Sequence, residues 1–365
     1  MTRYTRPLVA LVTGAALLGA AGAATAQTTG APAAKAAEAK ATATKGWRIY
    51  QTLSAKGTFW DAAASSWGNA WAVGEGASTA TGLAWRWNGH TWGTVTLPSG
   101  TRGISAVTTA GVGNTWLLAK NSAKQTVVLR WNNGTWSNPG AAHASGVRHI
   151  GAAGANQLWA AGDGFIRHYT GSSWTEKKLP DGVRINRIAV SHYNDVWAVG
   201  QKDASGGSDG RPFAMHWNGS KWTTTPVPTY PGGEGWGGSA LDGVAAIGAN
   251  DVYAGGNTYL GEDDNRALLV HWNGTKWSKA TLPSEVTDNW VGSVGVTPVG
   301  GGGIWYAWSH RHLMRRTPSG TTTDYTLPAK GLPYVNAVAY IPGSTTTLAV
   351  GSTGSPTHPY IALGH

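Results

Sequence analysis

Short apolar runs separated by turn-forming residues recur along most of the chain. One type of run places an aromatic or aliphatic pair among small residues, and seven related copies occur. These are AWAVG (70–74), TWLLA (115–119), LWAAG (158–162), VWAVG (196–200), VYAGG (252–256), IWYAW (304–308) and TLAVG (347–351). Runs this short, bounded by Gly and Asn and without helical periodicity, predict β-strands.

Three further apolar runs accompany each copy. A small apolar run such as INRIAV (185–190) precedes it, and a run ending in Trp-Asn-Gly, such as ALLVHWNG (267–274), follows it. The last run extends from Trp to Leu-Pro, as in KWSKATLP (276–283). Asn-Gly between two apolar runs predicts a tight β-hairpin. Four antiparallel strands in a unit of about 40–45 residues indicate one blade of a β-propeller.

Seven units predict an all-β fold, a seven-bladed β-propeller of four-stranded antiparallel blades over residues 46–365. The last unit, from Tyr334 onward, lacks its final strand, whereas GWRIYQTLS (46–54) has the pattern of that strand and no unit of its own. We therefore expect the N-terminal strand to complete the last blade as its outer strand. Closing the ring in this way removes an open sheet edge that would otherwise promote aggregation.

The repeat resembles secreted, Trp-rich bacterial propellers of the kelch or galactose-oxidase-like type. DVWAVG (195–200) is similar to the second strand of a kelch blade, and the Trp of the Asn-Gly-x-x-Trp turns is similar to the kelch Trp. The kelch double glycine is clear only at Gly255-Gly256. The radical-copper oxidases of this fold class need a Cys bonded to a Tyr, and this chain has no Cys. The sialidase Asp-box is also absent, so the resemblance implies a fold rather than an activity.

The aromatic residues divide into a recurring set and an irregular set. The chain has 21 Trp and only 3 Phe, and most Trp recur at a fixed place in the units. A residue that every blade repeats serves what all blades share, which is packing between blades. We therefore predict that the recurring tryptophans form the core, since large aromatics are usually well buried.

The N-terminal residues predict export. Arg3 and Arg6 precede an apolar stretch, and Ala24-Thr25-Ala26 offers a cleavage site, so residues 1–26 have the pattern of a signal peptide. Residues 27–45 are an Ala/Thr/Lys-rich segment that we interpret as a disordered linker. No other run is long enough to span a bilayer, so we expect a secreted, extracellular protein without membrane insertion. Without Cys, it must be held together by packing rather than by disulfides.

The irregular aromatics lie in or beside lengthened loops of the fourth to sixth units, and Tyr334 follows the loop PAKGLP (328–333) that leads into the seventh. Loops between blades and loops between the second and third strands open on the same face of a propeller, and insertions confined to one face often mark a binding face. The alternative is that these loops have lengthened without a function. The predicted ligand-binding residues are Tyr230, Trp236, Tyr259 and Trp290 as stacking platforms, with Glu262, Asp264 and Arg266 as polar contacts. Other acids in these loops are Asp203, Asp209, Glu234, Asp263, Glu285 and Asp288.

These features favour a lectin-like module that binds a carbohydrate or another cell-surface polymer, as a subunit of a larger secreted complex with a co-secreted protein. The formal net charge of +10, or +8 without residues 1–26, would help retention on an anionic cell wall. The absence of a basic tract argues against nucleic acid. A polysaccharide-acting enzyme, glycosidase or lyase, is one alternative, and a protein-interaction scaffold is another.

Cofactor sites are weakly indicated, and we expect none. GEDDN (261–265) offers carboxylate oxygens of the kind that Ca²⁺ prefers, but without the spacing of a known calcium loop. His310 and His312 alternate and would face the same side of a strand, yet no third metal ligand is identifiable. No motif of a hydrolase, zinc protease or phosphate-binding loop occurs, so the sequence identifies no catalytic residue.

Overall fold

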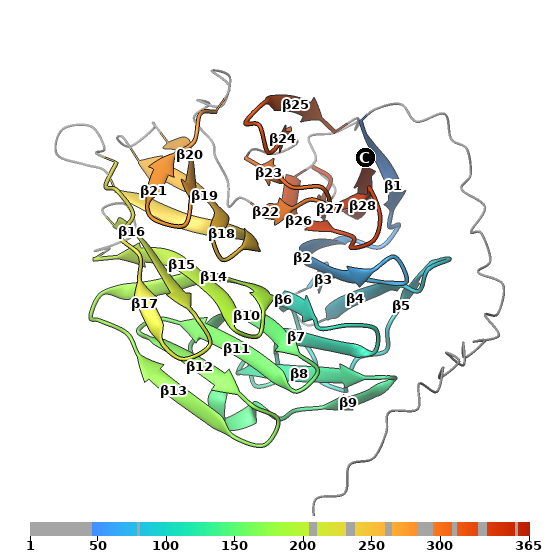
Figure 1. Cartoon of the computed structure of the whole chain (residues 1–365). Helices are drawn as coiled ribbons and strands as arrows, with labels where there is room; N and C mark the ends of the chain where they lie inside the picture. The colour runs from blue at the N-terminus through green and yellow to red at the C-terminus, as the bar shows by residue number, and fades with distance from the viewer. Residues whose placement is uncertain are drawn as a thin grey trace, which may run out of the picture. The chain divides into compact units, whose positions relative to one another are not determined.

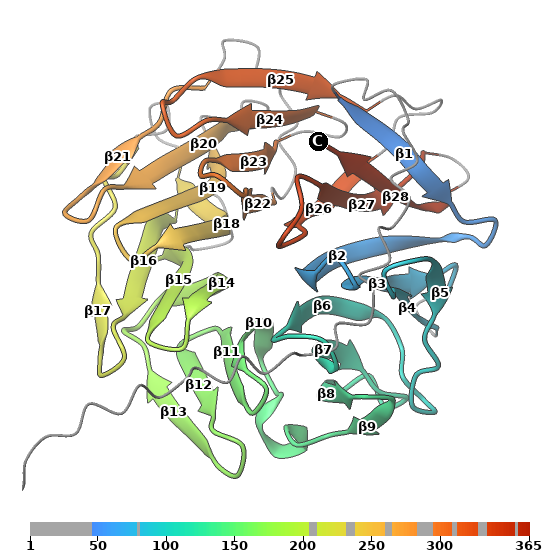
Figure 2. The same cartoon turned by 45° about the vertical axis from the view of Figure 1, so that its right-hand side comes forward.

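The computed structural model describes residues 46–78, 81–203, 210–230, 238–259, 265–282, 295–308, 312–327, 334–354 and 357–365. In this part of the chain, seven four-stranded antiparallel sheets surround a common centre as the blades of a propeller (Figures 1 and 2). The predicted fold class is therefore confirmed. The helical content of the same residues is one short 3₁₀ turn, η1 (Ala141–His143).

Each blade runs from an inner strand beside the centre of the ring to an outer strand at its edge. Blade 1 has β2 (Gly57–Ser66), β3 (Asn69–Gly76), β4 (Gly82–Trp87) and β5 (Trp92–Thr94); blade 2 has β6 (Ile104–Thr109), β7 (Asn114–Lys120), β8 (Thr126–Asn132) and β9 (Thr135–Ser137). Blade 3 has β10 (Val147–Gly154), β11 (Gln157–Gly162), β12 (Phe165–Tyr169) and β13 (Trp174–Lys178); blade 4 has β14 (Val183–His192), β15 (Asp195–Lys202), β16 (Arg211–Trp217) and β17 (Trp222–Thr224). Blade 5 has β18 (Ser239–Gly248), β19 (Asp251–Tyr259), β20 (Asn265–Trp272) and β21 (Trp277–Lys279). Blade 6 has β22 (Val296–Pro298), β23 (Ile304–Ala307), β24 (His312–Arg316) and β25 (Thr322–Thr326); blade 7 has β26 (Tyr334–Tyr340), β27 (Thr347–Ser352), β28 (Pro359–Gly364) and β1 (Trp47–Thr52).

The N-terminal strand closes the ring as predicted. β1 pairs antiparallel with β28, so that Trp47 lies opposite Gly364 and Thr52 opposite Tyr360. Trp47 is buried and meets Trp305 of blade 6 edge to face, with 5.0 Å between ring centroids. The first and last strands of the propeller therefore hold each other in place.

The two faces of the ring carry different connections. We call the face with the second-to-third-strand loops and the loops between blades the upper face, and the face with the other hairpins the lower face. Parts of the lengthened loops, residues 204–209, 231–237, 260–264 and 283–294, lie outside the described residues, but the strands that flank them end and begin at the upper face. The lengthened loops therefore all connect strands whose ends lie at the upper face.

The recurring tryptophans of the second strands form the core between blades, as predicted, whereas most of those on the third and fourth strands are only half-buried. Trp71, Trp116, Trp159, Trp197 and Trp305 are all buried. Each of the first four meets an aromatic ring of the next blade. The ring-centroid distances are 5.2 Å for Trp71–Trp131, 5.7 Å for Trp116–Tyr169, 5.2 Å for Trp159–Trp217 and 5.5 Å for Trp197–Trp272. Such edge-to-face and tilted contacts suit the aromatic quadrupole and add to the gain from burial.

A polar side chain on the third strand covers the ring of its own blade in blade 4. His216 lies opposite Trp197 and stacks on it with a centroid distance of 4.3 Å, and Asp195 Oδ1 lies 2.6 Å from His216 Nε2. Burial raises the pKa of Asp195, but the hydrogen bonds from His216 and Ser191 outweigh it, so the net shift is downward. The contacts among Asp195, His216 and Trp197 therefore fix the orientation of all three side chains.

Candidate functional site

A β-bulge interrupts the inner strand of six blades at the same place. The pairing with the second strand shifts register close to the upper end of β2, β6, β10, β14, β18 and β26. The extra residues are Trp60, Ser105, Arg148, Asn186, Asp242 and Asn336. We call this set, together with the residues that precede it on the same inner strands, the central rim. Bulges re-aim side chains and are frequent next to functional sites, so the central rim is a candidate site.

Just below the central rim, three charged or polar residues connect opposite sides of the ring. Arg187 of blade 4 places Nη1 3.5 Å from Asp61 Oδ1 of blade 1 and 2.7 Å from His149 Nε2 of blade 3. Asp61 is only 5% exposed and also accepts the backbone N–H of Val107 from blade 2 at 2.9 Å. We call Asp61, His149 and Arg187 the crossing network. It ties four inner strands together across the centre of the ring.

Burial sets the protonation of the crossing network. Burial raises the pKa of Asp61, while the Arg187 charge and the backbone hydrogen bonds lower it in part. Burial and then the charge of Arg187 hold the pKa of His149 well below its usual value. The Arg187 guanidinium and the backbone N–H of Ile188 both present donors to His149, at 2.7 Å from Nε2 and 3.2 Å from Nδ1, and a protonated ring could accept neither. The imidazole is therefore neutral, and it accepts the shorter, charge-assisted hydrogen bond from Arg187.

Arg187 also contacts blade 5. Its Nε donates to the backbone oxygen of Asp242 at 3.3 Å, and Asn186 Nδ2 donates to Asp242 Oδ1 at 3.0 Å. Burial raises the pKa of Asp242, and the charge of Arg187 offsets part of this shift. A side chain fixed by contacts to this many strands makes the inner ring rigid.

The upper part of the central rim is aromatic on one arc. Trp60 of blade 1 is 43% exposed, and Tyr334, the first residue of the inner strand of blade 7, is 42% exposed. The two strands are neighbours, and Asn336 Nδ2 donates to the backbone oxygen of Phe59 at 2.8 Å. Two large aromatic side chains are therefore presented to solvent by strands that are themselves held in place.

The opposite arc of the central rim is cationic. Arg148 of blade 3 donates to Asp163 at 2.7 Å, and Arg184 of blade 4 lies 3.1 Å from the same carboxylate oxygen. All three side chains are at least two-fifths exposed. A pocket of about 410 Å³ continues between blades 3 and 4, where Lys178 and Gln201 also line it. Two guanidinium groups share one carboxylate, which leaves net positive charge on this arc.

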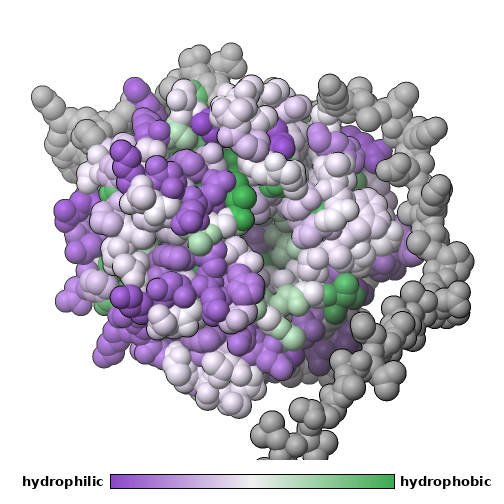
Figure 3. All heavy atoms as spheres, in the orientation of Figure 1, coloured by the Kyte–Doolittle hydropathy of each residue, from purple (hydrophilic) through white to green (hydrophobic). Residues whose placement is uncertain are grey.

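The space-filling view shows how hydropathy varies over one face of the ring. Figure 3 shows that the visible face of the ring is hollowed at its centre, with hydrophobic residues gathered around the hollow. Hydrophilic residues cover most of the remaining visible face.

The sequence-predicted ligand site is only partly described. Tyr230 lies partly buried against the core between blades 4 and 5, with Lys279 Nζ 5.7 Å from its ring centroid. Tyr259 ends β19, and Arg266 lies exposed on β20, opposite Thr258. The structure thus brings Tyr259 and Arg266 to adjacent strands at the upper face. The other predicted members, Trp236, Glu262, Asp264 and Trp290, lie outside the described residues, so this site stays a prediction.

The side chains weighed as metal ligands in the sequence are also only partly described. His312 stacks on Trp308 with a centroid distance of 5.0 Å and lies 3.5 Å from Asp324, whereas His310 and the GEDDN segment lie outside the described residues except for Asn265. Within the described residues, no three His, Cys, Asp or Glu side chains gather in a way that could hold a metal ion. The same part of the chain has no helix long and apolar enough to cross a membrane.

Sequence reasoning missed the central rim and the crossing network. The inner-strand runs FWDAA (59–63), VRHIG (147–151) and INRIA (185–189) each contain a polar pair or a Trp-Asp pair within apolar surroundings. These pairs are the bulged residue and its successor. Aligning the inner runs of all blades and asking which column breaks the apolar pattern would have found them.

The pH dependence of stability tests the protonation of His149. Its folded-state pKa lies well below the unfolded value of 6.5, so only the unfolded chain binds the proton, and stability should rise as pH increases toward 6.5. His149→Gln keeps an acceptor for Arg187 but cannot titrate. We expect urea unfolding to give a wild-type slope that exceeds the variant's by up to about 1.4 kcal/mol per pH unit below pH 6.5. Parallel profiles for the two proteins would contradict this assignment.

Comparisons with known proteins support the architecture. No family model matches the chain, and no curated protein matches it. Among solved structures, YCF48 bound to D1 peptide has a TM-score of 0.57 at 18% identity, covering 87% of this chain and 95% of its own. YCF48 from Cyanidioschyzon merolae has a TM-score of 0.56 at 15% identity, covering 88% and 98%. A chain of the mitotic checkpoint complex has 0.59 at 12% identity, covering 86% and 91%. At such identities the likeness establishes the propeller fold alone, and the kelch-like type stays a prediction.

Proposed function

We propose that the chain is a protein-binding scaffold that holds a segment of a partner protein at the central rim of its upper face. The observation that carries the proposal is the pairing of two arcs on this rim. Trp60 and Tyr334 form an exposed aromatic arc, and Arg148 and Arg184 form a cationic arc. Tryptophan, tyrosine and arginine are the residues that most often dominate the energy of protein interfaces.

The rim is also preorganised for binding. Arg187 ties together β2, β10 and β14 through Asp61 and His149, and Asn336 ties β26 to β2 through the backbone oxygen of Phe59. Little conformational freedom therefore remains to be lost on binding. The chemistry of the rim selects a segment with an apolar or aromatic side chain for the Trp60 arc. It also selects a carboxylate for the Arg148 arc, because guanidinium and carboxylate groups pair through two parallel hydrogen bonds.

Propellers of the same architecture support recognition of polypeptides. YCF48 is found bound to the D1 peptide, and the mitotic checkpoint complex is an assembly of proteins. Secretion of the chain remains an expectation from its N-terminal residues, and with it the partner would be an exported protein. Carbohydrate binding at the predicted Trp236 and Trp290 platforms also remains a prediction, since those residues lie outside the described part of the chain.

Single substitutions on the two arcs test the proposal. A partner is first captured from the source organism with the full-length protein and purified, and its dissociation constant is then measured by biolayer interferometry. We expect Trp60→Ala to weaken binding by about 10- to 100-fold, as for an aromatic hot spot. We expect Arg148→Glu to weaken it at least as much, with a smaller loss at high salt because screening reduces charge effects.

Matched controls lie on the lower face. Tyr193→Ala removes an exposed aromatic side chain from a lower hairpin, and Lys221→Glu reverses an exposed charge on another. Both variants should bind the partner as tightly as the wild type. The opposite result would overturn the proposal. If the upper-face variants bind as tightly as the wild type and the lower-face variants bind more weakly, the interface lies on the lower face.

A further inference from the structure

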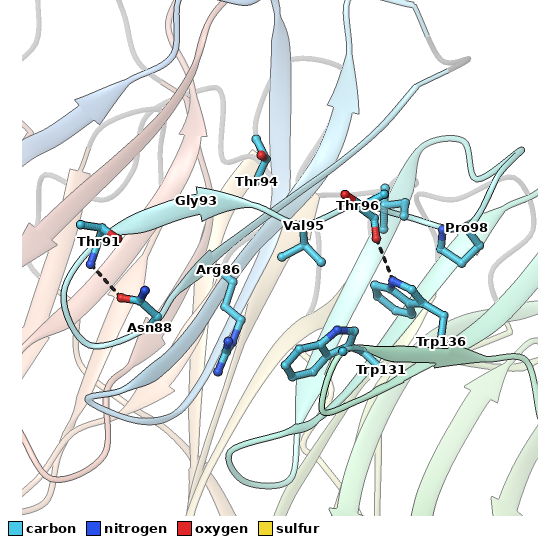
Figure 4. A pocket seen from close by; sticks show the side chains of 12 residues that line it. Arg86, Asn88, Thr91, Gly93, Thr94, Val95, Thr96, Pro98, Trp131 and Trp136 are labelled. Carbon is cyan, nitrogen blue, oxygen red and sulfur yellow. Dashed lines mark hydrogen bonds between the residues drawn. The ribbon is translucent and has the colours of Figure 1, made fainter.

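A groove of about 600 Å³ opens at the outer edge of the propeller between blades 1 and 2 (Figure 4). One wall is β5 with the segment that follows it as far as Pro98, and the other carries Trp131 and Trp136 of blade 2. Arg86 of β4 projects between the two walls. The groove lies far along the blades from the central rim, and nothing in the proposed function uses it.

Arg86 brings an unbalanced charge to this groove. Its Nε donates to Asn69 Oδ1 at 3.0 Å, and its guanidinium carbon lies 4.8 Å from the centroid of Trp131. Within the described residues it forms no ion pair with an acid, unlike Arg148 or Arg167. Burial lowers the pKa of Arg86, which reflects the cost of keeping this charge partly away from water. An anionic ligand would supply the missing counter-charge.

Gly93 leaves Arg86 uncovered. It lies directly opposite Arg86 on the neighbouring strand. Blades 2 to 5 carry a hydroxyl residue at the same place, and these residues are Ser137, Thr175, Thr223 and Ser278. A Cβ at Gly93 would meet nothing within 4 Å, and its backbone is not in the left-handed region. Neither packing nor backbone geometry therefore requires a glycine, and its effect is to open the groove above the guanidinium.

The remaining groups of the groove favour a sugar over an added peptide strand. Trp136 Nε1 donates to the backbone oxygen of Thr96 at 2.8 Å, which occupies a carbonyl that an incoming strand would need. The partly exposed indole of Trp136 offers an apolar face, and Asn88 and Thr91 line the groove with an amide and a hydroxyl. Hydroxyl-rich rings combine an apolar face with many hydrogen-bonding groups and suit such a lining.

We propose that this groove binds a uronic acid residue of an anionic polysaccharide. The sugar carboxylate pairs with the free edge of the Arg86 guanidinium, and the sugar ring lies against Trp136. Asn88 and Thr91 hydrogen-bond its hydroxyls. Because the proposal uses other residues at another place, it stands or falls independently of partner binding at the central rim.

The test uses the full-length protein and two probes, tetragalacturonate and a hyaluronan tetrasaccharide, titrated by isothermal calorimetry. We expect at least one probe to bind, with neutral maltotetraose at least tenfold weaker. Arg86→Gln and Gly93→Thr should each reduce binding of that probe at least tenfold. Gly93→Thr installs the residue of blades 3 and 4, keeps the charge and should leave the thermal midpoint at or above the wild-type value, since Gly is unfavourable in strands.

Arg130→Gln is the matched control. Arg130 has the same strand position in blade 2 and stacks on Trp116, but Ser137 lies opposite it. This variant should bind the probe as the wild type does, which separates loss of the groove from loss of a structural stack. Absence of binding by both uronate probes, equal binding by all variants, or binding of a hexaglutamate peptide in place of the uronates would each overturn the proposal.

Discussion

Replacing Trp197 by alanine is expected to lower the free energy of unfolding by about 3–5 kcal/mol. The side chain is fully buried at the contact of blades 4 and 5 and lies between His216 of its own blade and Trp272 and Trp277 of the next. Its removal leaves a cavity that neighbouring rings cannot fill, because strands on both sides hold them in place. The loss would be a large fraction of the stability of an ordinary domain.

Urea unfolding followed by tryptophan fluorescence and circular dichroism measures this loss. Tyr193→Ala is the control, because Tyr193 is 51% exposed on a lower hairpin and its removal should change stability by no more than about 0.5 kcal/mol. A Trp197→Ala variant as stable as this control would mean that the recurring tryptophans are not the core of the propeller.

Replacing Arg187 by methionine is expected to cost about 3–5 kcal/mol at neutral pH. The substitution leaves Asp61 buried without the cation that lies 3.5 Å from it, and it leaves His149 without its donor. The pKa of Asp61, already raised by burial, should rise further. An acid with a raised pKa favours folding below its unfolded value of 3.8 and loses that contribution as pH rises, so the cost should be larger at pH 8 than at pH 5.

A double-mutant cycle with Asp61→Asn separates the ion pair from general damage to the fold. Removal of both charges should recover more than half of the stability lost in Arg187→Met, since a neutral pair is far cheaper to bury than a single charge. If the double variant loses the sum of the two single losses, and its stability follows pH as that of Arg187→Met does, then Asp61 and Arg187 do not act as a pair.

The fold could be predicted because it repeats. The short runs that end in Trp-Asn-Gly and the runs related to VWAVG recur in most units, and the incomplete last unit with the unmatched GWRIYQTLS segment predicted how the ring closes. Most of these predictions depended on contacts between strands close in sequence. Burial of Trp71, Trp116 and Trp197 followed from recurrence, since a position shared by all blades faces what all blades face.

The central rim could not be predicted from those patterns. Whether Trp60 or Arg148 lies in regular pairing or in a bulge depends on a register shift that hydrophobic periodicity does not reveal. The contact of Asp61 with Arg187 depends on ring closure, which brings blade 1 opposite blade 4 although the two residues are far apart in the sequence. Sequence analysis therefore placed its candidates in irregular loops and passed over polar residues inside regular strands.

The groove between blades 1 and 2 was missed for a different reason. Gly93 stands out only when the outer strands of blades are aligned and the residue opposite Arg86 is compared with Ser137 or Thr175. A glycine in a Gly-rich chain, with 53 among 365 residues, carries no signal by itself. Gly93 becomes informative only in the structure, where open space surrounds the position of a Cβ and Arg86 lies opposite on the neighbouring strand.

Site-specific photocrosslinking tests the central claim most directly. A photoreactive phenylalanine analogue placed at Trp60 on the upper rim, or at Tyr193 on the lower face, reports which surface touches the captured partner. Protein binding at the central rim predicts a crosslinked product from position 60 and none from position 193. A bound partner that crosslinks from position 193 and not from position 60 would contradict it.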